Sequence, residues 1–312
     1  MRRWYLESFD DLQSFASPEE MSRSSDVVGC VASFTRVIKQ VLERHAPVVT
    51  SMAQGILSLR EQEGADFVKH YDFHEFLDRF YTSRIGIRML MQQHIELFCT
   101  TDGGVAPQGW VGVIDPRCKP AEVARDAAEN AAFLCDQTFG SSPRYEIVLP
   151  NSKKEIEFSY VPSFLYHIVF ELTKNAMRAV VETHRDSPML PAVKIIIVEG
   201  KEDCTIKIAD EGGGIARSAM PFVYSYLFST APRPKLLDHS DMNNAPIAGF
   251  GYGLPLSRLY ARYLGGDLNL ISIEGFGTDA LLHLKRATAG AVENLPEFSA
   301  RNKPTNGAIA RM

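Results

Sequence analysis

The sequence predicts an α+β chain in two parts, with a helical bundle over residues 1–142 and an α/β sandwich over residues 143–296. Apolar residues recur at helical spacing in the first part, and strand-like runs appear after Ser141-Ser142-Pro143. A Gly-, Pro- and Asn-rich stretch from 212 to 253 is longer than ordinary loops and is typical of a lid or binding segment. Residues 297–312 are expected to form a disordered tail.

Composition limits the classes of protein to be considered. The chain has 312 residues, of which 45% are hydrophobic and 23% charged, with a formal net charge of -5. Nucleic-acid binding usually needs a basic excess, and the longest apolar runs are far too short to span a bilayer. Five scattered cysteines without a CxxC pair argue against a disulfide scaffold and a structural zinc site. We expect no nucleic-acid partner and no membrane span.

The first part is expected to hold several long helices with short connections, which together make a bundle. Ser17-Pro18 followed by Glu20 forms a capping box, and Asp72 with Glu75 forms a second capping signature. Apolar residues at three- and four-residue spacing then define the helices. Downstream of Ser17 a helical run begins at Val27 and is ended by Pro47, and further helices are expected from Asp72 to Phe98 and from near Pro120 to Gly140.

In the second part, alternating apolar runs predict strands and one longer amphipathic run predicts a central helix. The expected strands are 145–149, 155–161, 193–199, 205–210, 267–273 and 279–285, and the expected helices are 163–184 and 254–264.

The central helix carries the first chemical signal. His167, Glu171, Asn175 and Arg178 are spaced at four, four and three residues, so they share one helix face. Polar faces are most often solvated. However, an asparagine oxygen is a suitable magnesium ligand, and a carboxylate one turn earlier can remove a proton beside a bound phosphate.

The second signal is Asp210 followed by Glu211 and three glycines, at the end of an alternating strand. An aspartate at this place can accept a hydrogen bond from an exocyclic amine such as that of adenine, and glycines let the backbone approach a flat base. A simple turn would need only one or two glycines.

The third signal is Gly249-Phe250-Gly251-Tyr252-Gly253, directly before a helix. Glycines at this place expose backbone N–H groups to phosphate oxygens, with help from the helix dipole. The segment lacks the Gly-Lys-Ser/Thr of a Walker A loop and does not match the dinucleotide pattern.

In this order, and with Gly275-Phe-Gly-Thr278, the signals resemble the nucleotide boxes of the ATPase fold shared by DNA gyrase, histidine kinases and MutL. Within that superfamily the chain resembles the mitochondrial pyruvate dehydrogenase kinase family, from about Trp4 to Pro296. The stretches that carry this resemblance are Glu171–Ala179, Ser229–Pro232, Gly249–Pro255, Gly275–Ala280, Ser51–Gly55 and Asp78–Tyr81.

The resemblance implies an ATP- and Mg²⁺-dependent serine kinase of the mitochondrial matrix, with residues 143–296 as its ATP-binding domain. Its expected substrate is the E1 alpha subunit of the pyruvate dehydrogenase complex, which phosphorylation inhibits. Expected partners are the lipoyl domain of E2, on the side of the helical bundle, and a second copy of the chain.

The resemblance also implies residue roles. Glu171 is the general base toward the target serine, His167 orients it, and Lys174 helps to neutralise phosphate charge. Asn175 ligates magnesium, Asp210 holds adenine and Thr278 supports the adenine end. The residues implied to bind ATP are Glu171, Leu172, Thr173, Lys174, Asn175, Ala176, Met177, Arg178, Asp210, Gly212, Gly214, Ser229, Thr230, Gly249, Phe250, Gly251, Tyr252, Gly253, Leu254 and Thr278.

Two departures from the family pattern bear on regulation. Family members carry a helical segment and a targeting peptide upstream of the residues that match Trp4, and commonly a C-terminal tail with an Asp-Trp pair. Neither is seen here. We therefore expect weak stimulation by a lipoyl domain, and dimerisation through the sheet of the second part.

Several alternatives stay open. A branched-chain 2-oxoacid dehydrogenase kinase, or a gyrase-type ATPase or ATP-gated switch in which Glu171 activates water, would use the same motifs. The bundle in front favours a kinase. A histidine kinase is disfavoured because His167 shares a face with the base, and a non-catalytic binding module is disfavoured because every expected polar group is present. His45 is a candidate contact for the protein substrate, whereas His74 and His94 are expected to be structural.

Overall fold

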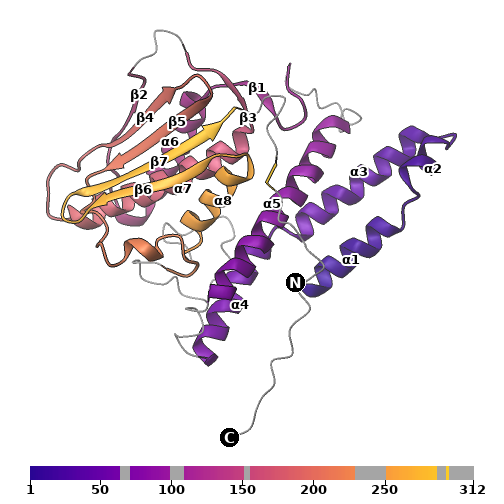
Figure 1. Cartoon of the computed structure of the whole chain (residues 1–312), viewed down its shortest axis with the longest axis horizontal. Helices are drawn as coiled ribbons and strands as arrows, with labels where there is room; N and C mark the ends of the chain where they lie inside the picture. The colour runs from indigo at the N-terminus through magenta and orange to yellow at the C-terminus, as the bar shows by residue number, and fades with distance from the viewer. Residues whose placement is uncertain (64–70, 99–108, 151–154, 229–250, 287–292, 295–312) are drawn as a thin grey trace, which may run out of the picture.

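The structure is a computed structural model that describes residues 1–63, 71–98, 109–150, 155–228, 251–286 and 293–294. Helices make up the first part of the chain and lie beside the sheet of the second part (Figure 1). The α+β architecture predicted from the sequence is confirmed. The helices of the first part are α1 (Arg2–Gln13), α2 (Pro18–Ser22), α3 (Val27–Arg44), α4 (Val48–Glu63) and α5 (Tyr71–Phe98).

The predicted capping box at Ser17 and the predicted apolar run before Pro47 belong to two separate helices, α2 and α3. The capping box at Ser17 is present, yet α2 ends at Ser22. The side chain of Asp26 then accepts a hydrogen bond of 2.9 Å from the Gly29 N–H and begins α3. An N-cap aspartate satisfies a free backbone donor, so it starts a helix even inside an apolar pattern.

A five-stranded sheet forms the second part, in the order β2-β4-β5-β7-β6. The β2–β4 pair is parallel, and every other neighbouring pair is antiparallel. A separate antiparallel pair joins β1 to β3. The strands are β1 (Asp115–Cys118), β2 (Tyr145–Val148), β3 (Phe158–Tyr160), β4 (Val193–Glu199), β5 (Asp203–Asp210), β6 (Asp267–Ile273) and β7 (Gly277–Lys285).

Three helices cover one face of this sheet: α6 (Pro120–Phe139), α7 (Pro162–Thr183) and α8 (Gly253–Tyr263). The helix α6 ends at Gly140, as predicted, with a left-handed φ of 73°. Although it precedes the expected boundary at residue 142, α6 packs along α7 and also contacts β2 and β4. The boundary itself stays a prediction.

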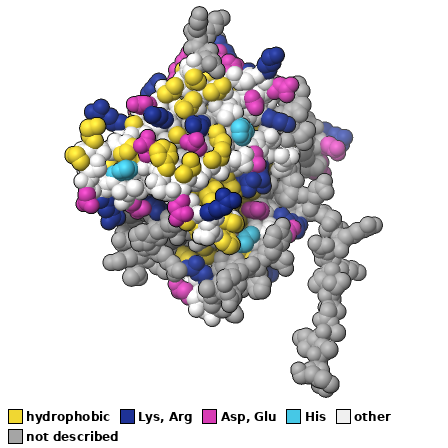
Figure 2. Space-filling view, turned by 60° about the vertical axis from the view of Figure 1, so that its left-hand side comes forward, with side chains coloured by type: hydrophobic (Ala, Val, Ile, Leu, Met, Phe, Trp, Pro, Cys, Tyr) yellow, Lys and Arg dark blue, Asp and Glu magenta, His cyan; other side chains and the backbone are white. Residues whose placement is uncertain are grey.

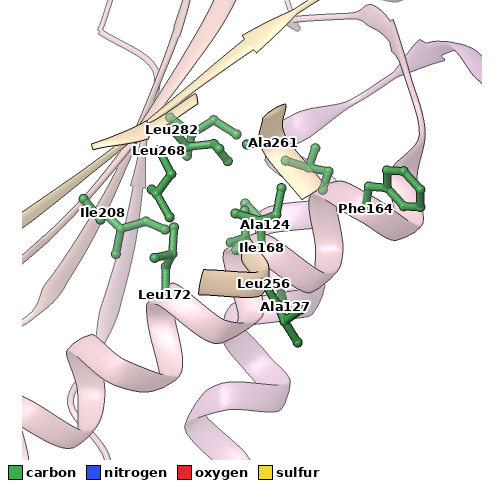
Figure 3. Packing of buried hydrophobic residues seen from close by; sticks show 14 of the residues in the cluster. Ala124, Ala127, Phe164, Ile168, Leu172, Ile208, Leu256, Ala261, Leu268 and Leu282 are labelled. Carbon is green, nitrogen blue, oxygen red and sulfur yellow. The ribbon is translucent and has the colours of Figure 1, made fainter. Parts of the chain in front are cut away.

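The main core lies between these helices and the sheet (Figure 3). Leu172 of α7 points toward Ile208 of β5, and Ile168 of α7, Leu268 of β6 and Leu282 of β7 belong to the same cluster. Burying side chains of this size contributes about 1.5–3 kcal/mol each. Burial of the apolar stripe fixes the rotation and position of α7 on the sheet. The polar stripe of the helix therefore faces away from the core in a defined position.

The core continues from the sheet domain into the first part. Leu77, Tyr81, Ile85 and Met89 of α5 are buried in the same hydrophobic cluster as the residues of α6, α7 and α8. None of the described helices combines the length and the apolar character required to cross a bilayer. The four described cysteines are free thiols.

Candidate active site

A cavity of about 400 Å³ lies where α7, the end of β5, the segment after β5 and the start of α8 meet. The polar stripe of α7 forms one wall, with Glu171, Lys174, Asn175 and Arg178. Apolar side chains from the strands close the opposite side. Clefts with a few convergent polar groups on an apolar background are typical of small-molecule sites.

Glu171 and Lys174 form an ion pair in this cavity, near the start of α8. The Nζ of Lys174 donates to Oε1 of Glu171 at 2.7 Å, and the lysine is only 5% exposed. A Cβ atom added to Gly253, the first residue of α8, would lie 2.4 Å from Oε2 of Glu171. The carboxylate is therefore placed between an ammonium group and a helix N-terminus, where a negative charge is favourable.

Asn175 lies one turn further along α7 and lines the same cavity. Its amide forms no hydrogen bond with any residue that the structure describes, so its oxygen is available to a ligand. Arg178 follows on the same face and bonds to Glu182 at 3.1 Å. The four-residue spacing in the sequence thus becomes one continuous polar wall.

His167 lies behind this wall, not in it. Its ring is 4.9 Å from that of Tyr260 on α8, and its Nε2 atom has no partner among the described residues. Burial lowers the pKa of His167, although the Glu171 carboxylate opposes this shift. The imidazole is therefore neutral at neutral pH, and its contact with Glu171 is electrostatic, without a direct hydrogen bond.

Asp210 ends β5 at the opposite end of the cavity. Its Oδ1 accepts hydrogen bonds from the N–H groups of Gly212 (2.8 Å) and Thr278 (3.3 Å). Burial raises the pKa of Asp210 to about 6, and these two bonds oppose the shift. The second oxygen stays free to accept a hydrogen bond from a ligand.

The glycines after Asp210 bring the backbone close to its neighbours. Gly214 has φ of 69°, and a Cβ atom there would lie 2.1 Å from the carbonyl oxygen of Ile273. Backbone hydrogen bonds from Gly213 to Phe276 and from Gly275 to Gly213 join this segment to the turn between β6 and β7. Gly214 thus permits the close approach of the two loops, whereas a Cβ atom at Gly212 would lie 2.5 Å from that of Ala179 on α7, so these glycines do more than form a simple turn.

Most of the residues predicted to bind ATP line this cavity, but some do not. Thr173 and Met177 are fully buried in the core, and Tyr252 packs against other tyrosines. Ser229, Thr230, Gly249 and Phe250 lie outside the described residues. The predicted residues that line the cavity are Glu171, Leu172, Lys174, Asn175, Ala176, Arg178, Asp210, Gly212, Gly214, Gly251, Gly253, Leu254 and Thr278.

The sequence reasoning missed other lining residues. Glu182 continues the four-residue spacing after Arg178, and Ile208 precedes Asp210 by two positions on the same strand face, so both carried a signal. The cavity residues not predicted are Ala179, Glu182, Thr183, Ile208, Ile215, Ala216, Ala219, Val223, Phe228, Pro255, Leu270 and Ala280.

His45 was expected to be a candidate contact for a protein substrate, and this is wrong. It is 4% exposed, and its Nε2 lies 3.0 Å from Oγ of Ser8. Since its ring is enclosed by α1, it is part of the interior of the helical part.

Fold and site together define an ATP-binding protein of the histidine kinase and gyrase type. A sequence profile described as histidine kinase-, DNA gyrase B-, and HSP90-like ATPase matches residues 160–288, and one described as mitochondrial branched-chain alpha-ketoacid dehydrogenase kinase matches residues 1–115.

Relatives that align with nearly the whole chain identify its family within this class of ATP-binding proteins. The probable pyruvate dehydrogenase (acetyl-transferring) kinase, mitochondrial, of Caenorhabditis elegans is 46% identical over 309 residues, which cover 96% of this chain and 73% of the relative. The pyruvate dehydrogenase (acetyl-transferring) kinase, mitochondrial, of Ascaris suum is 44% identical, covering 96% of this chain and 73% of the relative. The pyruvate dehydrogenase (acetyl-transferring) kinase isozyme 4, mitochondrial, of Homo sapiens is 44% identical, covering 96% of this chain and 71% of the relative. The chain belongs to the mitochondrial pyruvate dehydrogenase kinase family.

Proposed function

We propose that this protein is a mitochondrial ATP-dependent serine kinase that phosphorylates the E1 alpha subunit of the pyruvate dehydrogenase complex and thereby inhibits it. The observation that carries the proposal is the arrangement of Glu171, Asn175 and Asp210 along one cavity. The Glu171 carboxylate at one end can accept a proton, and the Asp210 carboxylate at the other end can accept a hydrogen bond from a nucleobase. The relatives named pyruvate dehydrogenase kinase support the substrate.

Adenine is expected at the end of the cavity that holds Asp210. Its exocyclic amine would donate to the free oxygen of Asp210, while Thr278 keeps the other oxygen in place. The phosphates then extend toward Gly251 and Gly253 at the start of α8, where backbone N–H groups stabilise negative charge.

Magnesium fits the residues at the phosphate end. Among the residues that the structure describes there is no cluster of three or more acidic, histidine or cysteine side chains that could hold a metal alone. Mg²⁺ commonly binds through one or two protein oxygens together with substrate phosphates and water. The free amide oxygen of Asn175 is the protein ligand that we propose. Bound there, the ion would neutralise phosphate charge.

Glu171 is the proposed general base. It would accept the proton of the substrate serine hydroxyl as that oxygen attacks the γ-phosphorus and the bond to the leaving ADP breaks. The ion pair with Lys174 fixes the orientation of the carboxylate. The neutral His167, one turn earlier on α7, interacts with it electrostatically. Positioning of this kind supplies much of the catalysis in phosphoryl transfer.

The alternative activities use the same site and differ in the acceptor. A gyrase-type ATPase would direct Glu171 at water, and a branched-chain 2-oxoacid dehydrogenase kinase would act on another complex. These three activities are separated by incubating the protein with labelled ATP in three reactions. The first contains purified pyruvate dehydrogenase complex, the second contains branched-chain complex, and the third contains neither. We expect label on pyruvate dehydrogenase E1 alpha. Phosphate release without protein labelling would reject the kinase assignment.

A homodimer through the sheet is the proposed assembly. The face of the sheet away from α6, α7 and α8 carries exposed apolar side chains, including Ile271 and Ile273 of β6 at 56% and 62% exposure. Figure 2 shows hydrophobic side chains on this side of the molecule, interspersed with basic and acidic ones. Sedimentation of Ile271→Lys beside the wild type tests the assembly, and an unchanged dimer would place the interface elsewhere. The E2 lipoyl domain is proposed as a further partner, by family membership.

A further inference from the structure

A hydrogen bond joins the helical part of the chain to the segment that borders the candidate nucleotide site. The hydroxyl of Tyr226 donates to Oδ1 of Asp78 on α5 at 2.6 Å, across 148 positions of sequence. Tyr226 is 1% exposed, whereas Asp78 is exposed. The bond is therefore charge-assisted, without the cost of burying the whole carboxylate.

The ring of Tyr226 belongs to a cluster of three tyrosines. Its centroid lies 5.7 Å from that of Tyr81 on α5 and 5.2 Å from that of Tyr252, the N-cap residue of α8. Tyr81 and Tyr252 meet edge to face at 5.9 Å. One rigid group of rings thus links α5, the segment ending at residue 228, and the start of α8.

The backbone beside this cluster is left-handed at two positions, and at Leu227 this conformation is unfavourable. Leu227 has φ of 64°, and no other described non-glycine residue has a positive φ. Gly251 has φ of 78°, and a Cβ atom there would lie 2.6 Å from the carbonyl oxygen of Phe228. A strained leucine persists only where surrounding contacts over-determine it, and such strain gathers at functional sites.

The strained segment leads directly into the cavity. Phe228, Gly251 and Gly253 line it, and Gly253 approaches the Glu171 carboxylate. The position of the first N–H groups of α8 therefore depends on where Tyr226 and Tyr252 are held.

We infer that the hydrogen bond from Tyr226 to Asp78 is a positioning contact for ATP, through which the helical part fixes the backbone that meets the phosphates. The inference rests on the proposed function of the cavity. Without the bond, the backbone at Gly251 and Gly253 would sample more conformations, and binding of the phosphates would have to order it. The adenine end is held separately by Asp210, so it should not respond.

The test compares ATP with adenosine, which has no phosphates. Tyr226→Phe removes one hydroxyl and keeps the ring. We expect the dissociation constant of Mg-ATP to rise about three- to tenfold. The inhibition constant of adenosine, measured by displacement of ATP, should stay as in the wild type. An equal loss for both ligands would mean general loosening and would overturn the inference.

Tyr263→Phe is the matched control, since Tyr263 at the far end of α8 is also 1% exposed and donates to a carboxylate, Glu293, at 2.7 Å. It should leave ATP affinity unchanged. Asp78→Ala should match Tyr226→Phe, the double variant should be no worse than either, and Asp78→Asn, which keeps an acceptor, should recover most of the affinity. If Tyr226→Phe binds ATP as tightly as Tyr263→Phe, the inference is overturned but the proposed function is not. A wild type that does not bind ATP would overturn the proposed function as well.

Discussion

At the scale of single residues, Asp210 is the group with the clearest pH dependence. Its pKa of about 6 is raised by burial and lowered by the N–H groups of Gly212 and Thr278. Only the ionised carboxylate leaves both oxygens as acceptors, one for the backbone and one for adenine.

We therefore expect ATP affinity to fall as pH decreases through 6, because protons compete with the adenine amine for Asp210. Asp210→Asn should bind ATP more weakly, by about 1–3 kcal/mol, and should lose this pH dependence. Calorimetric titrations of Mg-ATP at pH 5.5 and 7.5 measure it. Wild-type affinity that is the same at both values would contradict the role of Asp210.

The same carboxylate should destabilise the free protein at neutral pH. Its folded pKa lies above the unfolded value of about 3.9, so the folded state binds more protons between these values and stability falls as pH rises through this window. Asp210→Asn keeps the acceptor for both N–H groups and should raise the free energy of unfolding at pH 7 by about 1–3 kcal/mol. Urea unfolding at pH 7 and at pH 4.5 measures it. A less stable variant at pH 7 would mean that the ionised form is favoured overall.

Glu171 offers a test of chemistry apart from binding. Glu171→Gln keeps the size of the side chain but cannot accept a proton, so the phosphorylation rate should fall about 10²- to 10⁴-fold while ATP affinity changes little. Glu129→Gln, on the exposed face of α6 and outside the cavity, is the control. If the rate of Glu171→Gln stays at that of the control, another group is the base.

At the scale of elements, α8 is positioned from both ends. Its first residues border the cavity, and its second half is bound to β6 through Asp267, which receives hydrogen bonds from Arg258 (3.0 Å) and Arg262 (2.9 Å). Burial opposes ionisation of Asp267, but the two guanidinium groups and the N–H of Leu268 hold its pKa well below its usual range.

Asp267→Asn should lower the free energy of unfolding by about 1 kcal/mol, since Asp267 and Arg262 are each more than a third exposed and solvent screens the pairs. Because the folded pKa is depressed, this contribution is complete above the unfolded pKa of about 3.9 and is lost as pH falls further. Urea unfolding at pH 6 and pH 3 measures the difference between variant and wild type. A difference that persists undiminished at pH 3 would assign it to packing instead.

Elements with a long apolar period and a local stop signal were predictable from the sequence, as α6 with its C-terminal Gly140 illustrates. Short elements were not. The helix break before Asp26 depends on one capping side chain, and β1 is a four-residue strand that includes a proline and pairs only with a distant strand.

In the site, the polar stripe of α7 followed from spacing alone. Thr173 and Met177 lie between its members in sequence but point into the core, because a family motif covers consecutive residues and a helix divides them between two faces. The contact of Tyr226 with Asp78 has no local signal, since its partners are far apart in the chain.

At the scale of the whole molecule, the two parts share one hydrophobic core. Residues of α4 and α5 are buried in the same cluster as the sheet, whereas α3 meets α5 through a smaller cluster of Ile38, Val41 and Met91. Unfolding of the sheet domain should therefore involve α5, while α1 and α3 are less strongly attached.

The two tryptophans report on these two regions. Trp110 precedes a segment that is hydrogen-bonded to α5 through Gln93, and Trp4 lies on α1, which packs on α3. Neither lines the cavity. Mg-ATP at 100 times its dissociation constant should add about 2.7 kcal/mol of stability to whatever unfolds together with the site.

We expect Trp4→Phe, which leaves Trp110 as reporter, to show an unfolding midpoint in urea that ATP raises as much as the midpoint from far-UV circular dichroism. Trp110→Phe, which leaves Trp4, should show an earlier transition that ATP moves less, because the smaller cluster gives way first. Fluorescence during urea unfolding, with and without Mg-ATP, measures both. A Trp110 transition that ATP does not move would mean that α5 unfolds independently of the site, and the helical part could not then influence ATP binding through Asp78.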